Sequence, residues 1–386
     1  MTRHLDSTLP EPLLESLCQN GLDALPQALT ILLNLAMQAE RQKYLGLQPY
    51  ERSSERHDYA NGFKDKTVTS RVGELKVSVP QVRSSAFYPS ALEKGLRSER
   101  ALKLAIAEMY VQGVSTRKVA AITEALCGVE VSSTQVSRAA AEMDAVLTSW
   151  RNRPLEGFPY LYLDARYESV RLEGAVQKAA VLIAVGVDRA GKRQILGVSV
   201  SLSEHEVHWR EFLSSLVKRG LSGVRLVVSD AHEGLKAARC AVFGGVPWQR
   251  CQFHLQQNAQ AYVLRQEKKA EVAGDIRAVF SAPCRQEAEA LLSRTVAKYR
   301  PSMPKLADWM EANVPESLTV FSFPEAHRRL LRTTNGLERV NKEVRRRTRV
   351  ATLFPSEASC LRLVSAILME ISEEWETGKA YLLLED

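Results

Sequence analysis

Three acidic residues, Asp164, Asp230 and Glu338, stand at positions from which their carboxylates could meet. Asp164 follows the strand-like segment 160–163, Asp230 follows the strand-like segment 224–229, and Glu338 lies in the first turn of a helix-like segment. Two divalent ions can stabilise both the attacking and the leaving oxygen of a phosphodiester. Because hard ions such as Mg²⁺ prefer oxygen ligands, we interpret the three acids as metal ligands and catalytic residues for phosphodiester chemistry.

Two of these acids also have simpler explanations. Asp230 directly precedes a helix-like segment at 231–240, where an aspartate is often the N-cap. Glu338 follows Asn335 by three positions, which fits a capping box in which the glutamate reaches back to the N-cap amide. Asp164 fits a cap less well, because residues 165–172 alternate like a continuing strand. A fourth acid, Asp188, we interpret as a turn residue only.

The helix that carries Glu338 is strongly basic. Lys342, Arg345 and Arg349 follow Glu338 at intervals of 4, 7 and 11 residues, which places them on its face of the helix. Charged helix faces are usually solvated surface, but six basic residues against one internal acid, Glu343, are more than solubility needs. Such a face suits DNA phosphates, and the predicted contacts are Arg339, Lys342, Arg345, Arg346 and Arg349.

The elements that must position the acids begin after residue 154. Strand-like segments at 160–172, 179–187 and 194–201 are joined by short turns. A helix follows with Trp209, Phe212, Leu213 and Leu216 on one face, then a strand at 224–229, a helix at 231–240 and a strand at 246–251. This order is that of the ribonuclease-H-like fold, an α/β fold whose next element should be a helix. Residues 255–314 instead predict a helical insertion, and helices are expected at 335–349 and 356–375.

The region before residue 154 predicts mostly helical structure. Residues 1–45 predict helices, and 66–70 with 74–79 predict a strand pair that Pro80 should end. Between 96 and 146 the pattern is helical again, and Leu104, Ala107 and Val111 are expected to form a buried face.

Residues 115–143 have helix-turn-helix spacing. A helix capped at Ser115 or Thr116 is followed by a break at Gly128 and by a second helix that begins near 132–134 and runs to Met143. Two helices that simply pack together would give the same pattern, so the spacing alone does not decide between packing and DNA binding.

Composition is that of an ordinary globular protein. The 386 residues carry 52 basic and 45 acidic side chains, a net charge of +7, which permits a polyanionic partner without requiring one. No apolar run is long enough to span a bilayer, so no membrane role is expected. Six scattered cysteines suggest no disulfide framework, and a reducing cytoplasm is the expected compartment.

Several ordered blocks resemble one known family, the bacterial insertion-sequence transposases of the Mutator type. The blocks are 164–171 (DARYESVR), 211–235 with VSDAHEGL at its end, 248–254 (WQRCQFH) and 333–349 (TTNGLERVNKEVRRRTR), and the resemblance covers about 50–375. It implies an Asp-Asp-Glu (DDE) triad at Asp164, Asp230 and Glu338 in a ribonuclease-H-like domain, with a helical insertion before the third acid.

The resemblance also implies an activity. It implies a DNA transposase that cuts and joins strands at the terminal inverted repeats of its element, with two Mg²⁺ or Mn²⁺ ions in each active site. The route would pass through a circular copy of the element. A homodimer is expected, because two ends must be cut in concert, and the enzyme would be associated with the nucleoid when it is bound to terminal or target DNA.

Cys251 and His254 form the Cys-x-x-His part of the third block. This spacing is half of a zinc site, but Cys240 and Cys284 lack the spacing for a second half. We therefore expect Cys251 to pack in the core, and His254 to act at the active site by orienting the acids or DNA, as the family suggests. Trp248 could belong to the core or stack on a base.

With the resemblance, the helix-turn-helix becomes a candidate DNA reader, and Ser133, Gln135 and Arg138 are its predicted DNA contacts. The predicted division is 1–45 (helical), 46–95 (strand-containing, linker or DNA contact), 96–150 (helix-turn-helix-like), 151–254 with 333–386 (catalytic), and 255–332 (insertion). Two alternatives stay open: a ribonuclease-H-like nuclease or resolvase without strand transfer, and a domesticated DNA-binding protein.

Overall fold

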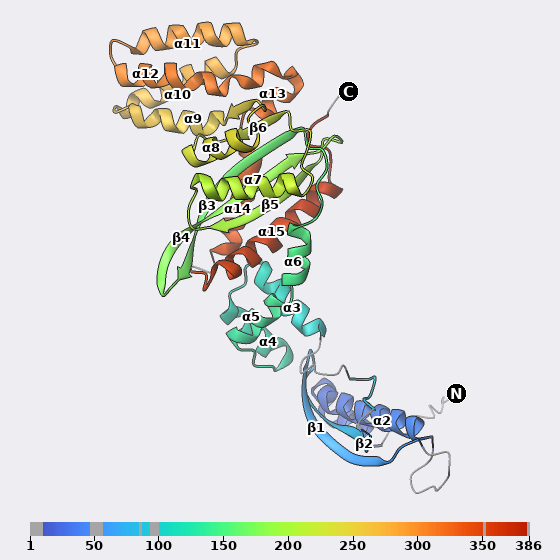
Figure 1. The fold of residues 1–386 in the computed structure, drawn as a ribbon. Helices are drawn as coiled ribbons and strands as arrows, with labels where there is room; N and C mark the ends of the chain where they lie inside the picture. Colours follow the sequence, from blue (N-terminus) through green and yellow to red (C-terminus); the bar gives the residue numbers. More distant parts are fainter. Residues whose placement is uncertain (1–10, 47–56, 85–86, 93–99, 350–352, 384–386) are drawn as a thin grey trace, which may run out of the picture. The chain divides into compact units, whose positions relative to one another are not determined.

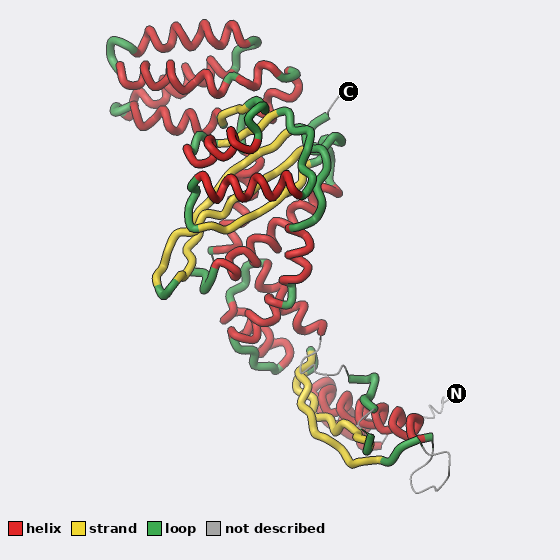
Figure 2. The backbone as a smooth tube through the Cα atoms, viewed as in Figure 1, coloured by secondary structure: helices red, strands yellow, loops and turns green. Residues whose placement is uncertain are grey.

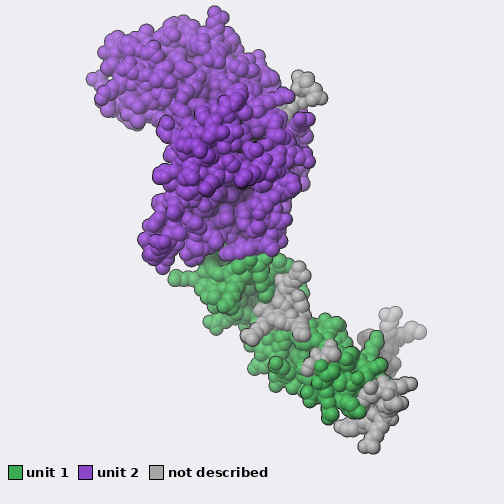
Figure 3. All heavy atoms as spheres, in the orientation of Figure 1, with its two compact units in different colours: residues 1–110, 114–142 green, residues 111–113, 143–386 purple. Residues whose placement is uncertain are grey.

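The computed structural model describes residues 11–46, 57–84, 87–92, 100–349 and 353–383. They divide into two compact units, residues 1–110 with 114–142 and residues 111–113 with 143–386, which Figure 3 colours separately. The predicted boundary near residue 96 lies outside the described residues, and the finer five-part division stays a prediction. No helix in the described ranges has the length and apolar character needed to cross a membrane.

The first part of unit 1 packs helices against a hairpin. Its elements are α1 (Glu11–Asn20), η1 (Gly21–Ala24), α2 (Leu25–Leu45), β1 (Ala60–Ser70) and β2 (Gly73–Val82). Met37 of α2 packs with Leu75, Val77 and Val79 of β2. The prediction that Pro80 ends the strand is wrong, because β2 continues to Val82 and Pro80 pairs with Phe63. A two-stranded hairpin leaves each strand an open edge, where the missing proline N–H costs little.

The second part of unit 1 contains α3 (Arg100–Val111), α4 (Thr116–Cys127) and α5 (Ser133–Ala141). Ser115 caps α4, Gly128 ends it in the left-handed conformation, and Ser132 caps α5, as the spacing predicts; α5 ends at Ala141, two residues before the predicted end. The predicted buried face of α3 is partly wrong: Ala107 and Val111 are buried, but Leu104 is 61% exposed. Leu102 and Ile106, two positions to either side of Leu104, point into the core instead.

Unit 2 is built on a mixed five-stranded sheet in the order β5-β4-β3-β6-β7 (Figure 1). Its strands are β3 (Tyr160–Leu172), β4 (Ala175–Val187), β5 (Arg193–Ser201), β6 (Leu226–Ser229) and β7 (Trp248–Arg250). The first three are antiparallel neighbours, whereas β6 and β7 run parallel to β3. The predicted α/β order of strands and helices is confirmed, and β3 continues through Asp164 as its alternation indicated.

Helices cover both faces of this sheet. On one face, α7 (Glu206–Lys218) and α8 (Glu233–Val242) bury Trp209, Leu213 and Leu235 against Leu161 and Leu163 of β3. The opposite face packs against α14 (Asn335–Thr348) and α15 (Glu357–Thr377), while α6 (Asp144–Arg151) packs on α15. Because strand side chains alternate between faces, Asp164 lies on the face opposite Leu161 and Leu163, toward α14.

Between β7 and α14 the chain forms the predicted helical insertion, whose red helices lie beyond the yellow strands in Figure 2. Its helices are α9 (Gln252–Ala259), η2 (Gln260–Tyr262), α10 (Gln266–Phe280), α11 (Arg285–Tyr299), α12 (Pro304–Asn313), η3 (Val314–Ser317), η4 (Thr319–Ser322) and α13 (Glu325–Leu331). They enclose a core of their own, centred on Leu255, Ile276 and Leu306.

Candidate active site

The sheet brings Asp164 and Asp230 to the same level on neighbouring strands. Parallel pairing of β3 with β6 matches Tyr160 with Leu226 and Tyr162 with Val228. Continuing this offset places Asp164 beside Asp230, which directly follows β6. Asp230 Oδ1 accepts a hydrogen bond of 2.7 Å from the Ala231 amide, but His232 rather than Asp230 is the N-cap of α8. The structure therefore does not support the explanation of Asp230 as a helix cap.

Asp164 is held by two hydrogen bonds in a buried setting. Its Oδ1 accepts from the Ala165 amide at 2.9 Å, and its Oδ2 accepts from Asn341 Nδ2 at 2.8 Å. Burial raises the pKa of Asp164 to about 6; the charges of Asp230 and Glu204 raise it too, whereas His254 and the Ala165 amide lower it. Ionising Asp164 is costly because the carboxyl group is buried beside a second carboxylate. A bound cation would stabilise its charged form.

Glu338 is not a capping residue. The N-cap of α14 is Thr334 rather than Asn335, and no side chain caps the helix. Instead, Glu338 Oε1 is buried and has no hydrogen-bond partner in the described part of the chain. Burying such an oxygen unpaired costs about 1–3 kcal/mol or more. The structure thus leaves the Glu338 carboxylate oxygen open to a ligand, on the helix face that also carries Asn341.

His254 lies beside the acids on α9. Its Nε2 is 3.8 Å from Glu338 Oε1, and each side chain is about a fifth exposed (22% and 23%). Interaction with the Cys251 side chain, and then the charges of Asp230 and Asp164, raise the pKa of His254 to about 9 against the effect of burial. His254 Nδ1 has no hydrogen bond of good geometry in the described residues, so its interaction with Cys251 is a loose one.

With its pKa raised to about 9, His254 would carry a positive charge at neutral pH beside Glu338. Cys251 itself is buried, as predicted. In the described ranges, however, no three His, Cys, Asp or Glu side chains are gathered closely enough to hold a metal ion by themselves.

The predicted DNA-contacting cations of α14 are exposed. Arg339, Lys342, Arg345, Arg346 and Arg349 all reach the surface. Arg346 is already paired with Glu343, at 2.7 and 2.8 Å. The sixth basic residue, Arg347, is buried and bound to Glu343 and Glu370, so it joins α14 to α15 and adds nothing to the surface charge.

The predicted DNA contacts of the helix-turn-helix lie in unit 1. Ser133, Gln135 and Arg138 are all exposed on α5. Gln135 has a structural role as well, because its side chain accepts a 2.7 Å hydrogen bond from the Ser132 amide in a capping box.

Comparison with known proteins decides the family. The profile of the Mutator family of transposases matches residues 7–378. The chain belongs to the Mutator family of transposases. It is 59% identical over 99% of both chains to the transposase for insertion sequence element IS406 of Burkholderia multivorans. It is 42% identical to that for ISRM5 of Rhizobium meliloti, over 94% of this chain and 92% of that one. It is 36% identical to the transposase for IS1081 of Mycobacterium tuberculosis, over 97% of this chain and 90% of that one.

Sequence reasoning missed several residues around the acids of this Mutator-family chain. Asn341 contacts Asp164 directly, and Arg166 donates to the Asn341 carbonyl oxygen. Glu204, which raises the pKa of Asp164, lies 3.8 Å from His232. The spacing of Asn341, three residues after Glu338, could have indicated that it shares the face of the third acid. We find no comparable signal for Glu204, which follows β5 in a loop.

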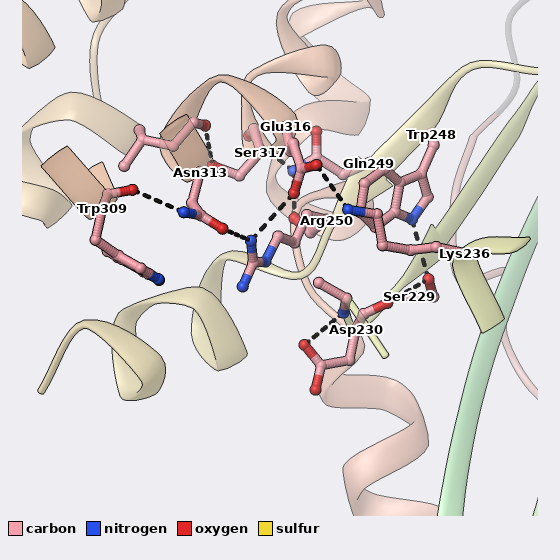
Figure 4. A network of polar contacts seen from close by, with 12 residues as sticks. Ser229, Asp230, Lys236, Trp248, Gln249, Arg250, Trp309, Asn313, Glu316 and Ser317 are labelled. Carbon is pink, nitrogen blue, oxygen red and sulfur yellow. Dashed lines mark hydrogen bonds and ion pairs between the residues drawn. The ribbon is translucent and has the colours of Figure 1, made fainter. Parts of the chain in front are cut away.

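A polar network next to Asp230 fastens the insertion to the sheet (Figure 4). Trp248 Nε1 donates to Ser229 Oγ at 3.0 Å, and its ring lies 5.2 Å from the charges of Lys236 and Arg239. Lys236 and the buried Arg250 both pair with Glu316 of η3, at 3.0 and 3.1 Å. Trp248 therefore belongs to the packing between β7 and α8, and it is only partly exposed.

Gln249 is fully buried in this attachment. Its Nε2 donates to Ser317 O and its Oε1 accepts from the Val320 amide, each at 2.7 Å. Gln249→Leu would leave the Val320 amide without its partner and remove one of the two side-chain bonds to Ser317 O, which Gln252 Nε2 also donates to at 3.0 Å. We therefore expect a loss of about 2 kcal/mol of unfolding free energy. Thermal melting should show a fall of roughly 4–8 °C in Tm. The matched control, Gln257→Leu on exposed α9 surface, should change Tm little; equal effects would show that Gln249 does not anchor the insertion.

Proposed function

We propose that this chain is a DDE transposase that cuts and joins DNA strands with Asp164, Asp230 and Glu338 as its catalytic triad. The observations that support the proposal are the level placement of Asp164 and Asp230 on the parallel strands β3 and β6, the packing of the Glu338 helix on β3 through Asn341, and membership of the Mutator family. The strand order β5-β4-β3-β6-β7, with only the last two strands parallel to β3, supports a ribonuclease-H-like catalytic domain.

The acids fit divalent metal ions in their chemistry. Asp164, Asp230 and Glu338 supply the oxygen ligands that Mg²⁺ or Mn²⁺ prefers, and Glu338 has a buried oxygen without a partner in the described residues. Two such ions, when bound, would neutralise charge on the scissile phosphate and activate a water or 3′-hydroxyl. Because the three acids do not form a closed metal site by themselves, DNA oxygens and water would complete the coordination.

The protein's own groups would prepare this site. His254, whose pKa is raised to about 9 and whose Nε2 is 3.8 Å from Glu338 Oε1, would offset the mutual repulsion of the acids. The exposed cations of α14 extend from Glu338 along the same helix, so they could hold the DNA backbone beside the acids.

We infer the DNA partners from the same features. Terminal inverted repeats would be read by the helix-turn-helix through Ser133, Gln135 and Arg138, and target DNA would meet the basic face of α14. Concerted cutting of two ends calls for a homodimer, the product pathway would pass through a circular copy of the element, and the enzyme would be associated with the nucleoid.

The test is strand cleavage and joining on a labelled duplex that carries an end of the element. With Mg²⁺ or Mn²⁺ we expect both nicked and joined products, and with EDTA neither, although DNA binding should persist. Cleavage without joining would favour the nuclease alternative, and binding without cleavage at any metal concentration would favour a domesticated DNA-binding protein. Either result would contradict the proposal.

A further inference from the structure

Asn341 connects two of the three acids. It lies three residues after Glu338 on α14, and its Nδ2 donates to Asp164 Oδ2 on β3 at 2.8 Å. Because an ionised carboxylate only accepts hydrogen bonds, the nitrogen of the amide must face Asp164. The orientation of the Asn341 side chain is therefore set by the acid that it contacts.

The remaining polar groups of Asn341 show that this contact is specific. Its backbone carbonyl accepts from Arg166, a residue of β3 whose side chain also pairs with Glu168 at 2.6 Å. Thr348, two turns further along α14, donates to the same Glu168 at 3.0 Å. The helix is thus fastened to β3 at Asn341 and again at Thr348, which restricts the position of the Asn341 side chain.

Asn341 Oδ1, by contrast, is buried without a partner in the described part of the chain. An asparagine that served only the packing would be expected to have both ends of its amide bonded. Together, one bond to a catalytic acid and one unsatisfied oxygen indicate a side chain that serves the active site.

We propose that Asn341 is a positioning residue that orients the Asp164 carboxylate for a divalent cation. By occupying one lone pair of Oδ2, it holds the carboxylate in one rotamer and leaves its other lone pairs for the ion. Groups that orient metal ligands in this way affect metal affinity by about 10–100-fold when they are replaced. The inference rests on the proposed function, because it assigns the metal to the same acids.

Mn²⁺ binding to the full chain tests the inference without DNA or turnover, by the loss of the electron paramagnetic resonance signal of free Mn²⁺. Asn341→Ala removes the amide, and Asn341→Leu removes the donor but keeps the volume. We expect both to raise the apparent Kd for Mn²⁺ about tenfold. Asn341→Ser, which keeps a donor, should retain more of the affinity. The matched control is Asn258→Ala, an exposed asparagine of α9, with melting curves taken on every sample.

A second readout separates positioning from general structure. In Mn²⁺-dependent cleavage, Asn341→Ala should shift the metal concentration at half-maximal rate by the same factor, whereas the rate at saturating metal should approach that of the wild type. Two results would overturn this inference while leaving the proposed function standing. One is a wild-type Mn²⁺ affinity in both Asn341→Ala and Asn341→Leu. The other is an equal loss of Mn²⁺ affinity in Asn341→Ser and Asn341→Leu. A wild type that binds no Mn²⁺ would overturn the metal chemistry of the proposed function and this inference with it.

Discussion

Asp164→Asn, Asp230→Asn and Glu338→Gln are each expected to lower the rate of strand cleavage by about a thousandfold or more, with DNA binding kept within about twofold. Each change keeps the size of the side chain but removes the negative charge with which the acid would hold a cation. Loss of one directed electrostatic contact to a transition state commonly costs about 10²–10³ in rate, and loss of a metal ligand should cost at least as much. Cleavage and joining of a labelled end duplex, beside a binding titration, measure both quantities.

Asp188→Asn is the matched control for these variants. Asp188 lies in the turn between β4 and β5, where its carboxylate accepts from the Lys192 amide at 2.8 Å, and we place it outside the active site. This variant should cleave at the wild-type rate. Activity in Glu338→Gln with loss in both aspartate variants would mean that Glu338 is not a metal ligand, and Glu204 would then be the next acid to test.

Arg345→Gln should weaken binding of DNA of any sequence and reduce its dependence on salt. Arg345 is exposed on the face of α14 that begins with Glu338. A phosphate contact contributes about 0.9 to the slope of log K against log salt, so the single change should lower the slope by about 1. The triple variant with Lys342→Gln and Arg349→Gln should lower it by about 3 and weaken binding at least about tenfold. Fluorescence anisotropy over a salt series measures both.

Arg346→Gln supplies the comparison on the same helix. Arg346 is also exposed, but its guanidinium is held by Glu343, so part of its charge is already neutralised. We expect its effect on the salt slope to be clearly smaller than that of Arg345→Gln. Slopes equal to that of the wild type in both variants would mean that this face of α14 is ordinary solvated surface and that DNA is bound elsewhere.

The elements that carry the acids could be predicted because their signals are local. The apolar run before Asp230, the alternation after Asp164 and the helical pattern around Glu338 each belong to one element. Local signals also place the first helix start at Ser115 or Thr116 and the second near 132–134, and the caps are Ser115 and Ser132. Such patterns work because side-chain period and capping chemistry depend on residues a few positions apart.

The interactions that complete the site are long-range, and the sequence does not reveal them. Asn341 and Asp164 are 177 positions apart, so only the packing of α14 on β3 brings them together. Arg347 is one of the six basic residues that predict a charged surface, yet it is buried because its partner Glu370 lies on α15. The apolar pattern of α3 predicts that Leu104 is buried, but such a pattern does not by itself say which side of a short helix meets the core.

Because α14 and α15 cover one face of the sheet, this face is covered only when the last helices of the chain have been synthesised. The strands with Asp164 and Asp230, the helices of the first face and the whole insertion leave the ribosome before Glu338 does. Until then one face of the sheet lacks α14 and α15, which cover it in the finished fold. A copy of the gene that ends before Asn335 would therefore encode a chain with one uncovered sheet face and without Glu338, rather than a weakened enzyme.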